Sequence, residues 1–162
     1  FRRMVSDLDL EDIVHFHGIV PIERVAEAMA HADLGIEPKG GTPFSDEAFS
    51  TKIFEFMMVG VPVIASDTTV HRRYVDEHAV RFFRVGDHRE LARAVRELHA
   101  EPKARQAYVR RGRELVSSLS WEVRKQGYFD LVDSYVKQAG QRAQNAPRRD
   151  LRSAEADKGS SA

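Results

Sequence analysis

Two neighbouring stretches decide the fold of this 162-residue chain: Asp46-Glu47-Ala48-Phe49-Ser50-Thr51-Lys52-Ile53-Phe54-Glu55, and Gly60-Val61-Pro62-Val63-Ile64-Ala65-Ser66 after it. Glu47 falls in a loop that follows an apolar strand, and Glu55 lies inside a helix that ends at Gly60, before another strand. The start of that helix carries unpaired backbone N–H groups, which attract a diphosphate. Carboxylates accept hydrogen bonds from ribose and sugar hydroxyls. The stretch therefore indicates a site for a nucleoside diphosphate joined to a sugar.

Short apolar strands alternate with helices along most of the chain. We expect the strands at residues 14–16, 34–36, 62–65 and 80–83, and helices that begin near Pro21, Ser50 or Thr51, His71, Asp87, Pro102 and Ser120. This alternation predicts an α/β fold, a Rossmann-like parallel sheet with helices on both faces. Ligands of such sheets bind beyond the carboxyl ends of the strands. The turn at Gly18 and the loop of Glu47 both follow strand ends, so we expect them on the same rim.

Composition narrows the function classes. The chain has 25 basic and 25 acidic residues, so nothing favours a nucleic acid as partner. It has no cysteine, which excludes disulfides and thiolate metal sites and favours a reducing compartment, so we expect a cytoplasmic location. No apolar run approaches the roughly 20 residues of a membrane-spanning helix.

Apolar periodicity is lost after about residue 138. We therefore predict a domain over residues 1–138 and a disordered tail over 139–162. Because the chain opens at Phe1 close to a strand, we interpret it as the C-terminal part of a longer protein.

Two further patterns allow a functional and a structural interpretation. His15-x-His17 puts two imidazoles on one face of a strand, but no further ligand stands at metal-binding spacing, so no metal is expected. A basic helix could contact an anionic membrane surface peripherally, or could simply be solvated. Its basic residues are Lys103, Arg105, Arg110, Arg111 and Arg113.

Five segments taken in order resemble the C-terminal, donor-binding half of the retaining family 4 glycosyltransferases, which have the GT-B architecture. These segments are residues 14–18, 32–38, Glu47-x7-Glu55, 60–66 and 86–92. The resemblance covers about residues 8 to 136. Each motif alone is weak, and their order and spacing carry the signal.

The resemblance implies a role for each matching residue. Glu47 would lie near the donor sugar as the catalytic carboxylate, and Glu55 would bind the ribose hydroxyls. The backbone of Phe49, Ser50 and Thr51 would hold the diphosphate, with Lys52 near its charge. The turn of Gly18, Ile19 and Val20 would lie against the nucleobase. Ala48, Ser50 and Thr51 replace small or glycine residues that are often found in the family after the first glutamate. This leaves open a donor with a different sugar, or a hydroxyl contact from Ser50 or Thr51.

The implied reaction transfers a sugar from a nucleoside diphosphate-sugar to an acceptor hydroxyl with retention of configuration, without a metal or other cofactor. A glycan or lipid-linked acceptor would bind an upstream half, so this chain would be inactive alone. Two alternatives stay open. One is a nucleotide-sugar epimerase of the same architecture, and the other is a non-catalytic flavodoxin-like binding module.

Overall fold

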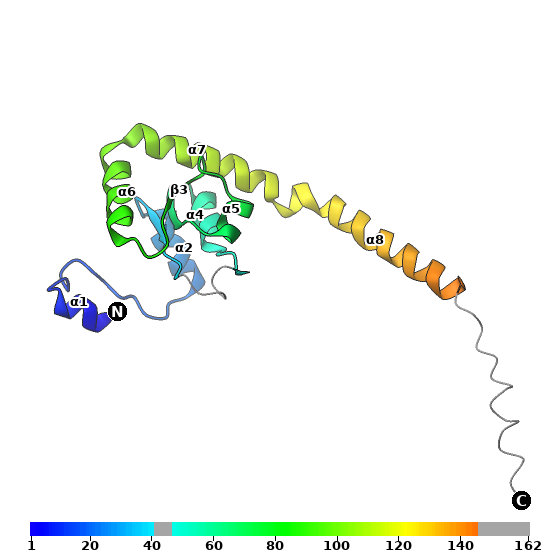
Figure 1. Ribbon diagram of the computed structural model, residues 1–162, viewed down its shortest axis with the longest axis horizontal. Coiled ribbons are helices and arrows are strands. Elements are labelled where there is room, and N and C mark those ends of the chain that lie inside the picture. The colour runs from blue at the N-terminus through cyan, green and yellow to red at the C-terminus, as the bar shows by residue number, and fades with distance from the viewer. Residues whose placement is uncertain (41–46, 146–162) are drawn as a thin grey trace, which may run out of the picture. The chain divides into compact units, whose positions relative to one another are not determined.

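The centre of the fold is a parallel sheet of three strands in the order β1-β2-β3. The computed structural model describes residues 1–40 and 47–145. The strands are β1 (Gly35–Glu37), β2 (Val63–Ser66) and β3 (Val80–Phe83) (Figure 1). Ile36 pairs with Ile64, and Ala65 pairs with Phe82. These strands match three of the four expected ones to within a residue.

Helices connect and follow the strands (Figure 1). They are α1 (Arg2–Asp7), α2 (Ile22–Ala30), α4 (Lys52–Val59), α5 (Thr69–Tyr74), α6 (His88–Ala100), α7 (Pro102–Leu119) and α8 (Trp121–Asn145). Residues 1–118 form one compact unit, and the described residues from Leu119 onward form another. Within α8, the rings of Trp121, Tyr128 and Phe129 contact one another, with centroids 5.7–5.9 Å apart.

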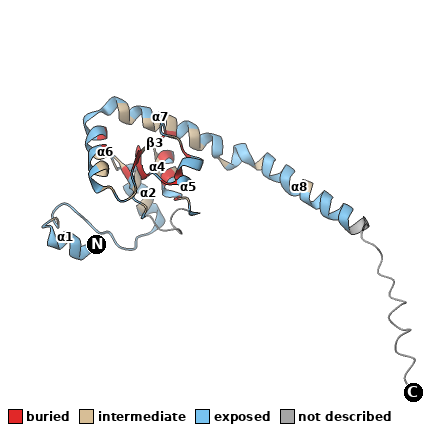
Figure 2. Cartoon of the chain, viewed as in Figure 1, coloured by how far each residue is buried: buried red, intermediate tan, exposed pale blue. Residues whose placement is uncertain are grey.

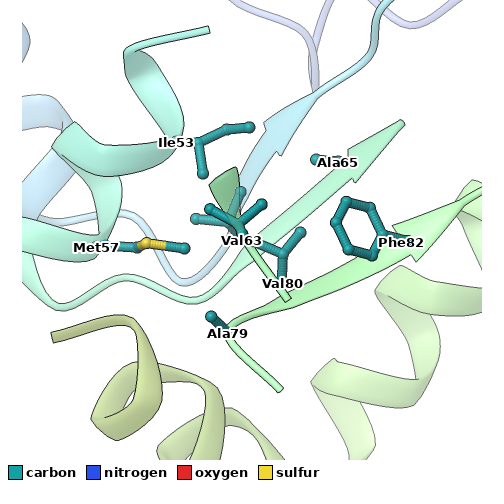
Figure 3. Close-up of a cluster of buried hydrophobic side chains, with 8 residues drawn as sticks. Ile53, Met57, Val63, Ala65, Ala79, Val80 and Phe82 are labelled. Carbon is teal, nitrogen blue, oxygen red and sulfur yellow. The ribbon is translucent and has the colours of Figure 1, made fainter. Parts of the chain in front are cut away.

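Side chains alternate between the two faces of the sheet, and each face has its own core. On one face, Val63 and Val80 lie against Ile53 and Met57 of α4 (Figure 3). On the other face, Ile64 and Phe83 pack with residues of α6 and the first half of α7. All four residues of β2 are buried. The buried residues gather at the centre of the fold, around β3 and α4 (Figure 2). The expected sheet with helices on both faces is therefore confirmed.

Two glycines determine how α4 packs on β1 and where α4 ends. A Cβ on Gly35 of β1 would lie 2.6 Å from the ring of Phe56, so the absence of a side chain lets that ring pack directly on the strand. Gly60 ends α4 with φ 81°, the left-handed conformation that glycine adopts at low cost. Its N–H donates to Met57 O, and the next N–H donates to Phe56 O.

Two expectations were wrong. Residues 14–16 are not a strand, because a strand needs a paired neighbour and this segment pairs with none of the described strands. The guanidinium of Arg2 instead lies over the ring of Phe16, 4.7 Å from its centroid. The tail was expected to be disordered from residue 139, yet α8 continues to Asn145, because Gln, Arg and Ala favour propagation of an existing helix. Residues 146–162 lie outside the described residues.

Candidate functional site

The candidate site lies where β1 and β2 end and α4 begins. The carboxyl ends of the two parallel strands meet at one rim of the sheet, and Ser66 is the last residue of β2. The hydroxyl of Ser66 accepts a hydrogen bond from Lys39 N at 2.8 Å and donates to Lys39 O at 3.2 Å. These two bonds fix the segment that follows β1 to the end of β2.

The residues at the start of α4 pack against the core at this rim of the sheet. Ser50 is buried, and Phe49 before it is half-buried against the core. The ring of Phe49 packs against Phe54 and Tyr74, with centroids 4.6 and 4.9 Å away. Lys39 Nζ also donates to Ala48 O. These contacts hold the backbone from which the first amides of α4 project, and such amides form an anion-binding surface.

Thr51 occupies the N-cap position of α4, as expected, but its side chain does not cap the helix. Its hydroxyl instead donates to Glu55 Oε1 at 2.9 Å, one turn further along. Glu55 is exposed, so its carboxylate remains accessible while Thr51 restricts its orientation. The nearby Lys52 Nζ lies 3.9 Å from Glu37 Oε2, so a carboxylate already faces the lysine that was expected near phosphate.

Glu47 is exposed. It is the first described residue after the gap at residues 41–46. The loop that carries it was expected to be functional, and most of that loop falls on those six residues.

The turn expected at the nucleobase contributes to a groove of about 700 Å³. Gly18 adopts φ 71°, and Val20 is at the border of exposure, whereas Ile19 is fully exposed. The groove is lined by residues of the turn, of α2 and of α4, namely His17, Gly18, Val20, Arg24, Val25, Glu27, Ala28, Met29, His31, Ala32 and Phe56. Neither Glu47 nor Glu55 lines it.

Sequence reasoning missed a buried histidine at this rim. His71 is 0% exposed, and its Nδ1 lies 2.8 Å from Ser66 O. Burial is the main cause that lowers the pKa of His71 below its usual 6.5. The available signal was its position, since a polar residue in the first turn after a buried strand falls at the ligand-binding rim.

The described residues contain no group of three or more His, Cys, Asp or Glu side chains that could hold a metal ion. Within the same part of the chain, none of the helices combines the length and the apolar character needed to cross a membrane. In the basic helix α7, Arg111 pairs with Asp76 at 2.7 Å, and Arg105 donates to the carbonyls of Leu98 and His99 at the end of α6. These two arginines therefore have partners within the fold.

The family described as "Glycosyl transferases group 1" matches residues 1–115 of the chain. A curated relative, the phosphatidyl-myo-inositol mannosyltransferase of Mycobacterium leprae (strain TN), is 33% identical over 115 residues, which are 70% of this chain and 30% of that protein.

Solved structures share the fold. Sucrose-phosphate synthase from Thermosynechococcus elongatus has a TM-score of 0.73 and 25% identity over 85% of this chain and 34% of its own. The Anabaena protein HepE in complex with UDP has a TM-score of 0.64 and 21% identity, over 82% of this chain and 35% of HepE. The C-terminal domain of LpcC from Francisella tularensis has a TM-score of 0.58 and 17% identity, over 72% of this chain and 58% of the LpcC domain. The chain thus spans about a third of the length of the Mycobacterium leprae relative and of the first two structures.

Proposed function

We propose that this chain, which belongs to the glycosyl transferases group 1 family, is the donor-binding half of a retaining glycosyltransferase. It would bind a nucleoside diphosphate-sugar and take part in transferring the sugar to an acceptor hydroxyl. The observation that carries this proposal is the start of α4. There a buried Ser50 and the N-cap Thr51 precede an exposed Glu55, beside the carboxyl ends of β1 and β2.

The chemistry of these groups fits a diphosphate-sugar. The amides and the positive end of the helix dipole of α4 would stabilise the negative charge that grows on the departing diphosphate. Glu55 would accept hydrogen bonds from the ribose hydroxyls, with its carboxylate oriented by Thr51. Glu47 would hold the sugar ring. Lys52 would exchange its partner Glu37 for phosphate, since 3.9 Å is a long separation for an ion pair and the lysine side chain is exposed.

For the full-length protein, the proposed donor is a nucleotide-sugar and the proposed acceptor is a lipid-linked molecule or a glycan. The Anabaena neighbour was solved with UDP, and the Mycobacterium leprae relative is named for mannosyl transfer and for a phosphatidylinositol. We place the acceptor site on a separate half of the full-length protein and the reaction in the cytoplasm, at the inner face of the membrane if the acceptor is a lipid. No metal is needed in this scheme, because helix amides and cationic side chains supply the positive charge. The 162 residues alone would bind nucleotide weakly and transfer no sugar.

The test is donor binding by the full-length protein and by its Glu55→Ala variant. Calorimetry with UDP, GDP and ADP identifies the preferred nucleobase. UDP-glucose, GDP-mannose and ADP-glucose are then tested as donors. Loss of hydrogen bonds to a charged acceptor costs about 1.5–3 kcal/mol, so Glu55→Ala should weaken donor binding roughly 10- to 100-fold.

The matched control is Glu101→Ala, which removes an exposed carboxylate after α6 and should leave binding unchanged. Equal affinities for the wild type and Glu55→Ala would remove the ribose assignment. Absence of binding to all six nucleotides would overturn the proposal, and would favour a non-catalytic module.

The stereochemistry and the reaction class have their own assay. NMR of the initial product should show the anomeric configuration of the donor, and nucleoside diphosphate should accumulate with it. Conversion of the donor sugar without release of nucleoside diphosphate, in the absence of acceptor, would identify an epimerase instead.

A further inference from the structure

His71 bonds to the start of its own helix through its backbone and to the end of β2 through its ring. Its backbone N–H donates to the hydroxyl of Thr68, the N-cap of α5, at 3.2 Å. Its ring Nδ1 lies 2.8 Å from the carbonyl oxygen of Ser66. A carbonyl oxygen only accepts hydrogen bonds, so Nδ1 carries a hydrogen and donates it. In the neutral ring, Nε2 is then the nitrogen without a hydrogen.

The same ring contacts the segment that leads into α4. The ring of Phe49 stands perpendicular to it, with an interplanar angle of 89° and centroids 5.8 Å apart. Phe49 directly precedes Ser50 and Thr51, where the diphosphate-binding amides begin. Ser66 in turn bonds to Lys39 through its hydroxyl. The imidazole therefore touches the α4 approach directly and reaches the segment after β1 through Ser66.

The surroundings favour an uncharged ring. Nε2 is buried and has no hydrogen-bond partner, the only such side-chain nitrogen or oxygen among the described residues. A proton there would leave a buried N–H without an acceptor. The charged groups that act on the ring are Glu37 and Lys39 at the end of β1 and Asp67 at the end of β2, and burial outweighs the two carboxylates. The facing Phe49 offers no charge.

We propose that His71, as a neutral imidazole, is a positioning residue for the donor site, because it holds the end of β2 and the approach to α4 at a fixed separation. This inference rests on the proposed function and deepens it. The ring acts through Phe49 and Ser66, so the donor amides are displaced when the Nδ1 hydrogen bond is lost or when the ring becomes charged.

Two substitutions separate the two ring nitrogens. In His71→Asn the side-chain amide can take the place of Nδ1 and keep the donation to Ser66 O. In His71→Gln it takes the place of Nε2, and the donation is lost. Both variants lose the buried ring and so a similar part of the stability. A purely structural role therefore predicts equal donor affinities for the two variants.

The measurement is the dissociation constant of the full-length protein for whichever of UDP-glucose, GDP-mannose and ADP-glucose the wild type binds. We expect His71→Asn to be weaker than the wild type by at most about threefold, because it loses the ring contact with Phe49 but keeps the bond to Ser66 O. His71→Gln should be at least about fivefold weaker than the wild type, the lower bound for a lost buried hydrogen bond. His78→Asn, which replaces an exposed histidine, is the control and should match the wild type.

The pH profile gives an independent readout. A nucleotide-sugar lacks the terminal phosphate ionisation near pH 6, so the ligand keeps its charge between pH 7.5 and 5. Because burial lowers the pKa of His71 below its usual 6.5, wild-type affinity should stay level down to that pH and fall only at lower pH, while His71→Asn keeps its affinity across the range.

Equal affinities for His71→Asn and His71→Gln, or equal pH profiles for the wild type and His71→Asn, would overturn the inference and leave the proposed function intact. A wild type that binds none of the three donors overturns both. If neither His71 variant folds, Phe49→Leu provides the test. This change removes the ring that faces His71 and keeps the backbone amides of the segment. An unchanged affinity would rule out the positioning role, whereas a severalfold loss would support it.

Discussion

Gly35→Ala should destabilise the protein, although alanine is the better residue for a strand in general. Relative to glycine, alanine gains about 0.5–1 kcal/mol of backbone entropy in a strand interior. At this position, however, the new Cβ would lie 2.6 Å from two atoms of the Phe56 ring and 2.9 Å from a third. Inserting a methyl group into such a contact costs typically about 1–3 kcal/mol. The two ranges together allow a net loss of about 0–2.5 kcal/mol. Because 2.6 Å lies far inside van der Waals contact, we expect a loss of about 1–2 kcal/mol.

The assay is a double-mutant cycle by urea unfolding, followed by far-ultraviolet circular dichroism. Phe56→Ala removes the ring, so the clash should vanish and Gly35→Ala in that background should stabilise by about 0.5–1 kcal/mol. The sign of the effect therefore reverses between the two backgrounds. If Gly35→Ala stabilises the wild type, or has the same effect in both backgrounds, the close packing of α4 on β1 is not what requires glycine.

Three further changes test local features. Thr68→Val should cost about 1 kcal/mol in urea unfolding, because the hydroxyl that caps α5 by accepting from His71 N is lost. Gly60→Ala should cost roughly 1–2 kcal/mol, since φ 81° is unfavourable for a residue with a Cβ, and a temperature melt should show it. The pKa of Asp76 is lowered mainly by the hydrogen bond from Arg111. The advantage of wild type over Asp76→Asn should therefore be present above the usual pKa of 3.8, stay below about 1 kcal/mol, and shrink in unfolding curves taken from pH 5 down to pH 3.

The sequence was sufficient to predict the sheet because buried parallel strands are short, apolar and bounded by turn residues. Residues 80–83 were placed correctly for this reason, and Gly60 marked the end of α4. Residues 14–16 have the same apolar character, but whether they pair depends on a neighbour that the local pattern does not contain. The end of α8 was missed because loss of apolar periodicity was taken as loss of helix, whereas a polar sequence of good helix formers continues a helix already begun.

The sequence predicted where in the fold the candidate site lies, but it did not predict most of the hydrogen bonds within the site. The positions of Glu55 and Thr51 on α4 followed from helix start signals, but the bond between their side chains did not. The involvement of Ser66 and His71 depends on how β1 and β2 lie side by side, which is tertiary information.

The two hydrogen bonds between the Ser66 hydroxyl and the backbone of Lys39 have a consequence for how such a site can change during evolution. They continue the link between β1 and β2 beyond the last ladder pair, Glu37 with Ala65, so the strand ends stay close to the spacing of paired strands, about 4.8 Å. A larger or differently shaped substrate cannot be admitted by spreading these ends apart. New specificities must therefore arise by exchanging side chains along the rim, while its dimensions are inherited unchanged.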